Sequence, residues 1–554
     1  MSASTPFRIL KSGGPAAYER DASRGVMLIG FERMENLGLG YLASTLRSAG
    51  YSVLVHDYER DPEEILAAAC RTQPILIGFS LIFQFYVYRF GALIRYLREH
   101  GVSCHFTMGG HFPSLSHEHT LGLVPELDSV VRFEGEHTLL ELVDLLSMGK
   151  EWRSISGIAY RSGGETISMP LRPLIEDLDE LPHPERNTEP RTILGRKAAP
   201  ILASRGCART CSFCSIHMFY RAAPGKIVRT RKPAEVVKEM RALYEQRGIT
   251  VFLFQDDDFP LFGPVWRRWA EDFLNELYRQ YLAGRVIWKI NCRADVVDAD
   301  LFAQMRDAGL YLVYMGLESG TEEGLKTLHK QVTVAQNLRA VRILKQLDLR
   351  FEFGFMLFDP STTFESVREN LRFLRAIVGD GCTAATFCRM LPYDGTPIKD
   401  ELMRTGRMRG NVCNPDYDFL DPRISEFYEA LSHVVNVVGW IHGIEALSPQ
   451  LNFAWNEVAI LDRLFPALPD LPGYKETLRG ITRDSNELLL RVVEDISYVY
   501  SDSRPNLWSA HALENQCRQF LHNLLRERNR FIGRNQDVLL AELSREHSQL
   551  SISA

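Results

Sequence analysis

The sequence has few cysteines, no long apolar run and no large excess of charge. Ten cysteines among 554 residues are too few for a scaffold held together by disulfides. The longest mostly apolar stretch covers residues 75–85, whereas a helix that crosses a bilayer needs about 20 apolar residues. No basic segment followed by an apolar one opens the sequence, so export is not expected. These absences predict a cytoplasmic protein without a membrane span.

Charge and composition narrow the class of protein further. The 64 Lys and Arg residues against 70 Asp and Glu residues give a formal net charge of −6, so no overall basic field exists to hold nucleic acid or an anionic membrane. Hydrophobic residues make up 45% and charged residues 24% of the chain, as in globular proteins. At about 150 residues per domain, this length predicts three or four domains.

The amino-terminal part alternates between short apolar segments and segments with helical spacing. The expected strands are residues 26–31, 53–57, 75–80, 104–110 and 129–134, and the expected helices are residues 37–49, 62–70, 85–100, 113–123 and 137–148. Such alternation with short connections predicts parallel strands and right-handed crossovers, and hence a doubly wound, Rossmann-like sheet.

Ligands of such sheets bind beyond the carboxyl ends of the strands. The residues expected there are Ser80, Gly109, Gly110, His111, Glu134, Gly135 and Glu136. Paired glycines allow a large flat ligand to approach the backbone, and they also simply form tight turns. The sequence leaves both explanations open.

A second α/β series follows a proline-containing linker. Its expected strands are residues 200–204, 250–255, 286–291, 311–316, 350–358 and 384–390, which predicts a partial (β/α)6 barrel of the TIM type with its chemistry at the carboxyl ends of the strands. Beyond residue 421 the spacing is helical. The predicted division is therefore 1–170 for the Rossmann-like domain, 171–198 for the linker, 199–420 for the barrel and 421–554 for an all-helical domain.

The strongest motif is a group of three cysteines, Cys207, Cys211 and Cys214, with the spacing C-x3-C-x2-C, just after the first barrel strand. A four-iron cluster normally takes four cysteine ligands, so three would leave one iron open, as catalytic zinc sites keep one position open. Two alternatives remain: a zinc site of three cysteines and His217, and cysteines that only pack. The next cysteine, Cys292, lies in an expected strand.

This motif resembles that of the radical S-adenosylmethionine (SAM) superfamily, in the branch with an amino-terminal cobalamin-binding domain. An aromatic residue, Phe213, directly precedes the last cysteine. Weaker motifs occur in family order within about residues 20–400, namely residues 109–111, 133–136, 254–259, 291–295, 316–320 and 391–397. The sequence departs from the family pattern at residues 355–360, where glycines are common in the family.

The resemblance implies three cofactors. The three cysteines would hold a four-iron, four-sulfur (4Fe-4S) cluster, whose open iron would bind the amino and carboxylate groups of SAM. The residues assigned to SAM binding are Phe213, Gln255, Asp256, Asp257, Glu318 and, for the SAM carboxylate, Arg293. Carboxylates after a strand also favour helix N-termini without any ligand, so a structural role for the aspartates stays open.

Cobalamin would bind to the amino-terminal domain through Ser80, Gly109, Gly110, His111, Glu134, Gly135 and Glu136. None of the fifteen histidines has an aspartate two residues before it, so the Asp-x-His-x-x-Gly segment that places a histidine on cobalt in many cobalamin proteins is absent. The lower face of cobalamin would then carry water or nothing. His111 either contacts the cofactor or caps a helix, and the domain itself could be a relic without cobalamin.

Positive charge is concentrated around the cysteines. Residues 186–232 contain eleven Lys and Arg residues and one acidic residue, Glu189. Such a run is usually solvated surface, but it would also attract an acidic electron donor such as flavodoxin or ferredoxin. Arg229, Arg231 and Lys232 are the expected docking residues.

The sequence therefore predicts a cobalamin-dependent radical SAM methyltransferase that acts on an unactivated carbon or a phosphinate phosphorus of a small, natural-product-type molecule. Radical rearrangement, cyclisation, dehydrogenation and transfer of the aminocarboxypropyl group are the enzymatic alternatives. An iron–sulfur sensor or electron-transfer protein is the alternative outside catalysis. Substrate choice by a helical cap over the barrel mouth is a further expectation.

Overall fold

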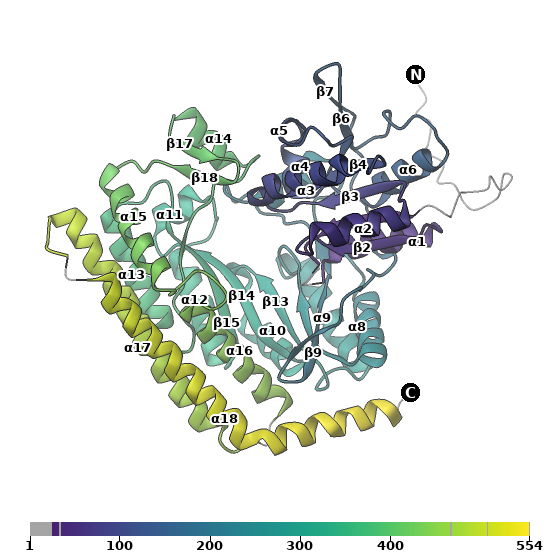
Figure 1. Cartoon of the computed structure of the whole chain (residues 1–554). Coiled ribbons are helices and arrows are strands. Elements are labelled where there is room, and N and C mark those ends of the chain that lie inside the picture. The colour runs from purple at the N-terminus through teal and green to yellow at the C-terminus, as the bar shows by residue number, and fades with distance from the viewer. Residues whose placement is uncertain (1–24, 33–34, 466–467, 507, 553–554) are drawn as a thin grey trace.

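The first sheet is built from short apolar strands, and every residue of its interior strand β1 is buried. The computed structural model describes residues 25–32, 35–465, 468–506 and 508–552, and Figure 1 shows this sheet and its helices beside the rest of the chain. The strand order is β2-β1-β3-β4-β5-β6-β7, with β1 to β5 parallel and the last two antiparallel. The strands are β1 (Val26–Gly30), β2 (Val53–Asp57), β3 (Leu76–Ser80), β4 (His105–Gly109), β5 (Ser129–Val131), β6 (Ile158–Ser162) and β7 (Glu165–Ser168).

Helices cover both faces of this sheet, as expected of a doubly wound fold. Asn36 and Asp61 cap two of them by accepting backbone N–H groups, and Pro62 opens the second in the first turn, where its missing N–H costs nothing. The elements are α1 (Leu37–Ser48), α2 (Pro62–Thr72), the 3₁₀ turn η1 (Gln84–Tyr86), α3 (Val87–Glu99), α4 (His111–Leu115), α5 (His117–Leu123) and α6 (Glu136–Ser147). Two separate apolar clusters form, one on each face.

The second sheet is curled into a half-barrel with the order β16-β15-β14-β13-β12-β9-β8 (Figure 1). Its strands are β8 (Arg191–Ile193), β9 (Arg196–Ile201), β12 (Ile249–Phe254), β13 (Ile287–Cys292), β14 (Leu310–Glu318), β15 (Arg350–Phe358) and β16 (Cys388–Arg389). All pairs are parallel except β8 with β9. The six parallel strands confirm the predicted partial barrel, whereas the edge strand β8 comes from the segment that the sequence predicted as linker.

Helices connect the barrel strands, and two short antiparallel strand pairs accompany them. The helices are α7 (Ser215–Ala222), α8 (Pro233–Arg247), α9 (Gly263–Arg279), η3 (Ala294–Val296), α10 (Ala299–Asp307), α11 (Glu322–Thr327), α12 (Val334–Gln346), α13 (Phe364–Val378) and α14 (Pro397–Arg404). One pair joins β10 (Ser204–Arg205) to β11 (Arg229–Thr230) across the cysteine loop and α7, and the other is the hairpin of β17 (Met408–Asn411) and β18 (Asn414–Tyr417).

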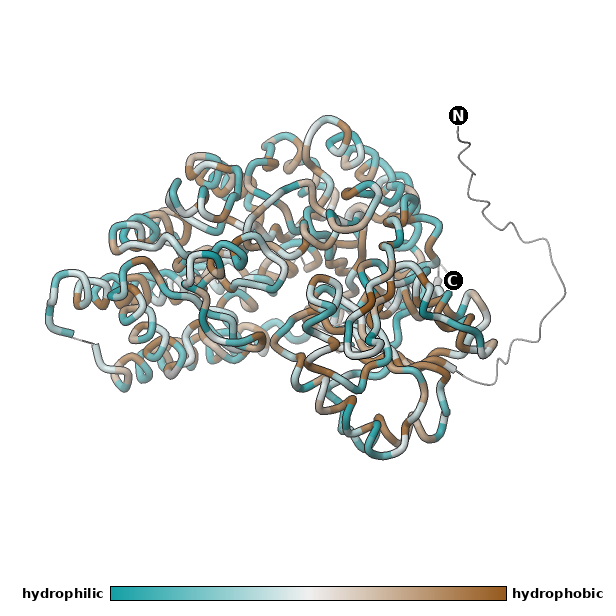
Figure 2. Tube along the Cα trace, turned by 90° about the horizontal axis from the view of Figure 1, so that it is seen from above, coloured by the Kyte–Doolittle hydropathy of each residue, from teal (hydrophilic) through white to brown (hydrophobic). Residues whose placement is uncertain are grey.

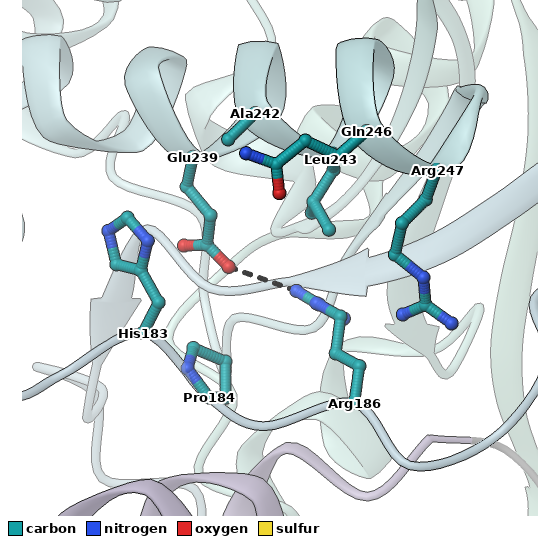
Figure 3. A pocket seen from close by; sticks show the side chains of 8 residues that line it. All are labelled: His183, Pro184, Arg186, Glu239, Ala242, Leu243, Gln246 and Arg247. Carbon is teal, nitrogen blue, oxygen red and sulfur yellow. Dashed lines mark hydrogen bonds and ion pairs between the residues drawn. The ribbon is translucent and has the colours of Figure 1, made fainter. Parts of the chain in front are cut away.

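Buried ion pairs fix the connecting segment, which includes the short turn η2 (Leu178–Glu180), between the two sheets. Arg186 contacts Glu35, which follows β1, and Glu239 of α8, each at 3.0 Å. The Arg186–Glu239 pair borders a pocket of about 360 Å³ that Arg247 also lines (Figure 3). Because each charge has a partner, this polar interface holds the segment to both sides.

The carboxyl-terminal part is helical, as predicted. It consists of α15 (Pro422–Val437), α16 (Leu447–Leu464), α17 (Leu471–Asp502) and α18 (Ala510–Ile552). Hydrophobic and hydrophilic residues alternate along the peripheral helices (Figure 2), as one-sided packing requires. Among the described residues, no helix is long and apolar enough to span a bilayer. The predicted absence of an export signal concerns residues that lie outside the described ones.

Candidate active site

The three cysteines of the C-x3-C-x2-C motif lie in the loop between β10 and α7. Gly206 begins this loop with a φ of +88°, and a Cβ there would lie 2.0 Å from the carbonyl oxygen of Ile227, so the turn requires glycine. The N–H of Ser212 donates to the carbonyl of Leu328 at 3.0 Å, and the N–H of Ile398 donates to the carbonyl of Ser212 at 3.1 Å. The loop is thus held by backbone hydrogen bonds to distant segments.

The thiols of Cys207, Cys211 and Cys214 are free; Cys211 is buried, and the other two residues are partly exposed. Burial raises the pKa of Cys207 to about 12 and that of Cys214 to about 11, but a coordinating thiol is deprotonated by its metal. Nη1 of Arg293 lies 3.7 Å from the Cys211 sulfur and offers it positive charge. No three His, Cys, Asp or Glu side chains in the described ranges converge on one metal ion, whereas a cluster spreads its thiolates over separate irons. This donor set fits a 4Fe-4S cluster with one open iron.

Two of the three aspartates after β12 brace the backbone that leads into the cysteine loop. Asp256 is buried and accepts hydrogen bonds from the Ser204 hydroxyl and, at 3.2 Å, from the N–H of Ala203. Asp257 accepts the N–H of Gly206 at 3.0 Å. Burial raises the pKa of Asp256 to about 7. Partial desolvation by the surrounding protein raises the pKa of the more exposed Asp257 to about 6. Their predicted contact with SAM stays a prediction.

The third aspartate, Asp258, has one carboxylate oxygen that is not used by any described residue. Its Oδ2 lies 3.9 Å from the Cys207 sulfur. Its Oδ1 is buried and has no hydrogen-bond partner in the described part of the chain. Burial raises the pKa of this carboxyl to about 6. Because a buried polar atom without a partner is costly, Asp258 offers a ready acceptor for a donor on a ligand beside Cys207.

Glu318 and Lys330 form a buried ion pair of 3.0 Å at the carboxyl end of β14. Glu318 has a φ of +63°, which only a well-supported backbone maintains. A Cβ at Gly316 would lie 2.3 Å from Oε1 of Glu318 and 2.8 Å from Nζ of Lys330. The glycine of the 316–320 motif is therefore needed to make room for this pair.

Arg293 uses all of its guanidinium nitrogens within the protein. Nε donates to Asp295 at 3.0 Å, Nη1 points to the Cys211 sulfur, and Nη2 donates to the carbonyl of Lys330. These contacts place a fixed positive charge beside the predicted cluster. Of the other residues assigned to SAM, Gln255 is exposed at the end of β12 and Phe213 packs against the main core. Direct contact of these residues with SAM stays a prediction.

The glycines at the carboxyl end of β4 are explained first by packing. Gly110 has a φ of +113°, and a Cβ there would lie 2.2 Å from the carbonyl oxygen of Leu81, just after Ser80 of β3. A Cβ at Gly109 would lie 3.2 Å from the carbonyl oxygen of Val131. His111 opens α4 and its ring lies 4.5 Å from that of Phe219 in α7. Burial lowers the pKa of His111 to about 4, so its imidazole is neutral near pH 7.

The acidic residues Glu134 and Glu136 bind arginines of the half-barrel. Glu134 accepts hydrogen bonds from Arg229 at 2.8 Å and from Arg205 at 3.2 Å, and Glu136 accepts from Arg205 at 2.6 Å. Gly135, between them, is the residue before α6. Arg205 directly precedes Gly206, so these carboxylates join the first domain to the cysteine loop. Their predicted contact with cobalamin is not tested by these bonds.

Two sequence-based expectations are wrong. Arg229 and Arg231 were expected on a docking surface, but both are 3% exposed and paired with acidic residues, so only the exposed Lys232 of that trio can meet a partner. The expected helical cap over the barrel mouth is also wrong for α16, because its Asn452 and Asn456 bind the first residues of β15 instead.

Sequence reasoning missed Asp258 as the free carboxylate, Lys330 as the partner of Glu318, and Tyr393, whose ring lies 5.6 Å from that of Phe85 after β3. Asp258 lies within a motif that the sequence identified, but its orientation depends on the turn after β12. Tyr393 also lies within a family-like motif. Lys330 carries no local signal, because it follows Glu318 by twelve residues in an irregular segment.

Comparisons with known proteins agree with this geometry. Residues 31–143 match the model of the B12 binding domain, and residues 201–374 match that of the radical SAM superfamily. An uncharacterized methyltransferase of Pyrococcus horikoshii is 29% identical, covering 65% of this chain and 77% of the relative. An anaerobic magnesium-protoporphyrin IX monomethyl ester cyclase of Rubrivivax gelatinosus is 28% identical, covering 61% of each chain. The cobalamin-dependent SAM radical enzyme OxsB with aqua-cobalamin bound is similar in fold, with a TM-score of 0.67, 20% identity and coverage of 95% of this chain and 84% of that one.

Proposed function

We propose that this chain, which belongs to the radical SAM superfamily and carries a B12-binding domain ahead of its radical SAM core, is a cobalamin-dependent methyltransferase. Its cofactors are a 4Fe-4S cluster, SAM and cobalamin. When bound, the cluster and SAM supply a radical and cobalamin carries a methyl group, while the protein orients them and excludes water. The proposed acceptor is an unactivated carbon or a phosphinate phosphorus of a small molecule.

The observation that carries this proposal is that the ligand-binding edges of the two sheets face each other. Phe85 after β3 contacts Tyr393, His111 after β4 contacts Phe219, and Glu134 after β5 binds two arginines beside the cysteine loop. Ligands of both fold types bind at the carboxyl ends of the strands. A corrin on the first edge and a cluster on the second would thus share one enclosed space.

The chain's own residues have separable tasks in this proposal. Cys207, Cys211 and Cys214 hold the cluster, and the guanidinium of Arg293 stabilises the thiolate of Cys211. The free oxygen of Asp258 would accept a hydrogen bond from the SAM amine. The ion pair of Glu318 and Lys330 would border SAM on the side away from Asp258. The other proposed contacts with SAM and cobalamin are those predicted from the sequence. The three thiols and the unpaired oxygen of Asp258 fit these ligands.

The test is product analysis of the anaerobically reconstituted enzyme with SAM, hydroxocobalamin and a chemical reductant. Turnover should release S-adenosylhomocysteine and 5′-deoxyadenosine together. Release of 5′-deoxyadenosine alone would favour a radical rearrangement, cyclisation or dehydrogenation, a candidate supported by the likeness to the cyclase. Methylthioadenosine would indicate aminocarboxypropyl transfer. Absence of all three would favour an iron–sulfur sensor or electron-transfer protein.

An acidic electron carrier such as flavodoxin or ferredoxin is the proposed reductant in the cell, in the cytoplasm. All ten cysteines are free, as a reducing compartment would keep them. Exposed cations flank the cysteine loop at Arg221 and Lys232. If they steer the carrier, Lys232→Ala should slow cluster reduction by flavodoxin at low salt and not at high salt. An unchanged rate at both would remove this docking site.

A further inference from the structure

The first domain meets the half-barrel on both sides of its sheet, and the two contacts differ in kind. On the side of α1 and α6 the contact contains buried ion pairs, in which Glu134 binds Arg205 and Arg229 and Glu136 binds Arg205. The connecting segment packs on the same side, where its apolar residues cluster with Tyr41 of α1. We call this the ion-pair contact. Breaking buried ion pairs is strongly destabilising, so this contact is firmly held.

On the side of α3, one buried amide joins the first domain to two segments of the second. Gln84 lies four residues after β3 and is 2% exposed. Its Nε2 donates to the carbonyl of Val412 at 2.7 Å, and its Oε1 accepts the N–H of Asp394 at 2.8 Å. Val412 lies at the tip of the β17–β18 hairpin, and Asp394 lies in the loop between β16 and α14. Both ends of the amide are therefore used in holding the second domain.

The tip of the hairpin packs into the first domain. Val412 is buried and belongs to the apolar cluster that α2 and α3 form on their face of the sheet. The Cys413 sulfur contacts the carbonyl oxygen of Gln84 at 3.8 Å. A Cβ at Gly410 would lie 2.0 Å from the carbonyl oxygen of Asn414, so the tight turn requires glycine. The hairpin is thus a short, defined arm from the half-barrel to the first domain.

This second contact, which we call the clasp, consists mainly of neutral hydrogen bonds and apolar packing. Among the described residues, the one possible ion pair across it joins Asp394 to the half-exposed imidazole of His119, at 3.5 Å. Neutral hydrogen bonds contribute much less to stability than the loss of a partner in a buried ion pair costs. The clasp is therefore the weaker of the two contacts.

The clasp and the ion-pair contact lie on either side of the expected cobalamin edge. In the first sheet β4 lies between β3, which precedes Gln84, and β5, which precedes Glu134. The ring contact of His111 with Phe219 belongs to the side of the ion pairs, because Phe219 also packs against Phe133. A ligand on the carboxyl end of β4 would thus have the firm contact on one side and the weak one on the other.

We propose that the clasp at Gln84 opens and closes the space between the two domains to cobalamin, with the ion-pair contact as the hinge. The inference rests on the proposed function for the identity of the ligand and on the contacts alone for the opening. A corrin enclosed between two domains enters and leaves only when one contact is released, and local opening begins at the weaker contacts. Gln84 is then a positioning residue, whose amide binds the second domain and not the cofactor.

The rates of cobalamin binding to the cluster-loaded protein test the clasp without a known substrate. Association is followed by the visible absorbance of hydroxocobalamin, and dissociation by a chase with excess methylcobalamin. Gln84→Leu should raise both rates about ten- to thirtyfold, because two neutral hydrogen bonds are lost. The Kd should stay the same, since the closed state is destabilised in the free and the loaded protein alike. Val412→Ala should act in the same direction through the tip alone, and the exposed Gln246→Leu on α8 should change neither rate.

Hydrogen exchange of the cluster-loaded protein without corrin measures the opening itself. In Val412→Ala the amide of Asp394, which donates to Gln84, should exchange faster than in the unaltered protein. The amides of residues 196–206, beside the ion-pair contact, should keep their exchange rates.

Three results would overturn the proposal. Faster dissociation alone, with a weaker Kd, would make Gln84 a direct contact of the corrin. Unchanged rates in both Gln84→Leu and Val412→Ala would show that cobalamin enters without release of the clasp. Equal exchange of the Asp394 amide in Val412→Ala and the unaltered protein would show that the tip does not hold the clasp. A protein that takes up no corrin would refute the proposed function instead, and the exchange measurement would then decide on the clasp by itself.

Discussion

Replacing Glu134 by glutamine should loosen the contact between the B12-binding domain and the cysteine loop. The Glu134 side chain is 6% exposed and accepts hydrogen bonds from Arg205 and Arg229, whose side chains are 10% and 1% exposed. The substitution keeps the shape of the side chain and removes its charge. Two guanidinium groups then face one another across a neutral amide, with Glu136 left as the partner of Arg205.

The expected cost follows from this burial. Removing one partner of a buried ion pair destabilises by about 3–5 kcal/mol, and the lower end applies here because Arg205 keeps Glu136 and Arg229 keeps its bond to the carbonyl of Ile175. A local cost of about 3 kcal/mol corresponds to about a hundredfold faster exchange of the amide hydrogens that this contact protects. The exposed pair of Glu141 with Arg172 provides the control, since such pairs contribute about 0–1 kcal/mol.

The assay is hydrogen exchange by mass spectrometry at pH 7 on peptides that cover residues 129–136, 196–206 and 227–231. Burial by itself raises the pKa of Glu134, but Arg205 and Arg229 outweigh it, so the pKa in the folded protein lies below 4.5. The stabilisation is therefore present above pH 4.5 and is lost as the pH falls through the lowered value. Equal exchange in Glu134→Gln and Glu141→Gln at pH 7, or a difference that grows at low pH, would refute the reasoning.

Three further predictions concern other parts of the molecule. Asp258→Asn should weaken SAM binding about tenfold, because a neutral amide oxygen replaces the carboxylate as acceptor and charge-assisted hydrogen bonds are about twice as strong as neutral ones. Equilibrium dialysis against the exposed Asp300→Asn checks this, and loss of iron instead would assign Asp258 to the cluster loop. Burial raises the pKa of Glu32 to about 7, so the stabilisation of the fold by the protonated carboxyl is complete below pH 4.5 and is lost as the pH rises through about 7. Glu32→Gln should flatten this part of the plot of unfolding free energy, measured with urea, against pH, and an unchanged plot would contradict the prediction. Ile460→Ala should lower the free energy of unfolding by about 2–4 kcal/mol, because it leaves a cavity where α16 packs against the strands of the half-barrel. The exposed Ile444→Ala should lower it by about 0.5 kcal/mol or less. Similar losses in the two variants would show that α16 does not seal the half-barrel there.

The strands and the cysteine motif could be predicted from the sequence because their signals are local. Strands β1 to β4 and β12 to β15 are apolar runs bounded by polar residues, and the structure places them within a few residues of the predicted ranges. The loop that holds Cys207, Cys211 and Cys214 follows directly from its spacing and from the strand before it. Signals of this kind need no knowledge of which distant segments meet.

The features that the sequence did not predict depend on contacts between segments that are distant in the chain. Arg205 and Arg229 belong to a basic run that indicates solvated surface, yet they are buried because Glu134, more than seventy residues earlier, lies across the domain contact. Counting charges along the chain cannot detect a partner in another domain. The position of α16 has the same origin, because the stripe of Asn452, Asn456 and Ile460 is an ordinary amphipathic pattern until the inner face of the sheet meets it.

The central claim is that three cysteines leave one iron of a cluster open to SAM. Electron–nuclear double resonance of the reduced, anaerobically reconstituted enzyme, with SAM carrying nitrogen-15 in its amino group, tests this directly. The claim predicts a resolved coupling between the cluster spin and the labelled nitrogen, which disappears without SAM. A cluster signal that SAM does not change, or a protein that contains zinc in place of iron, would contradict it.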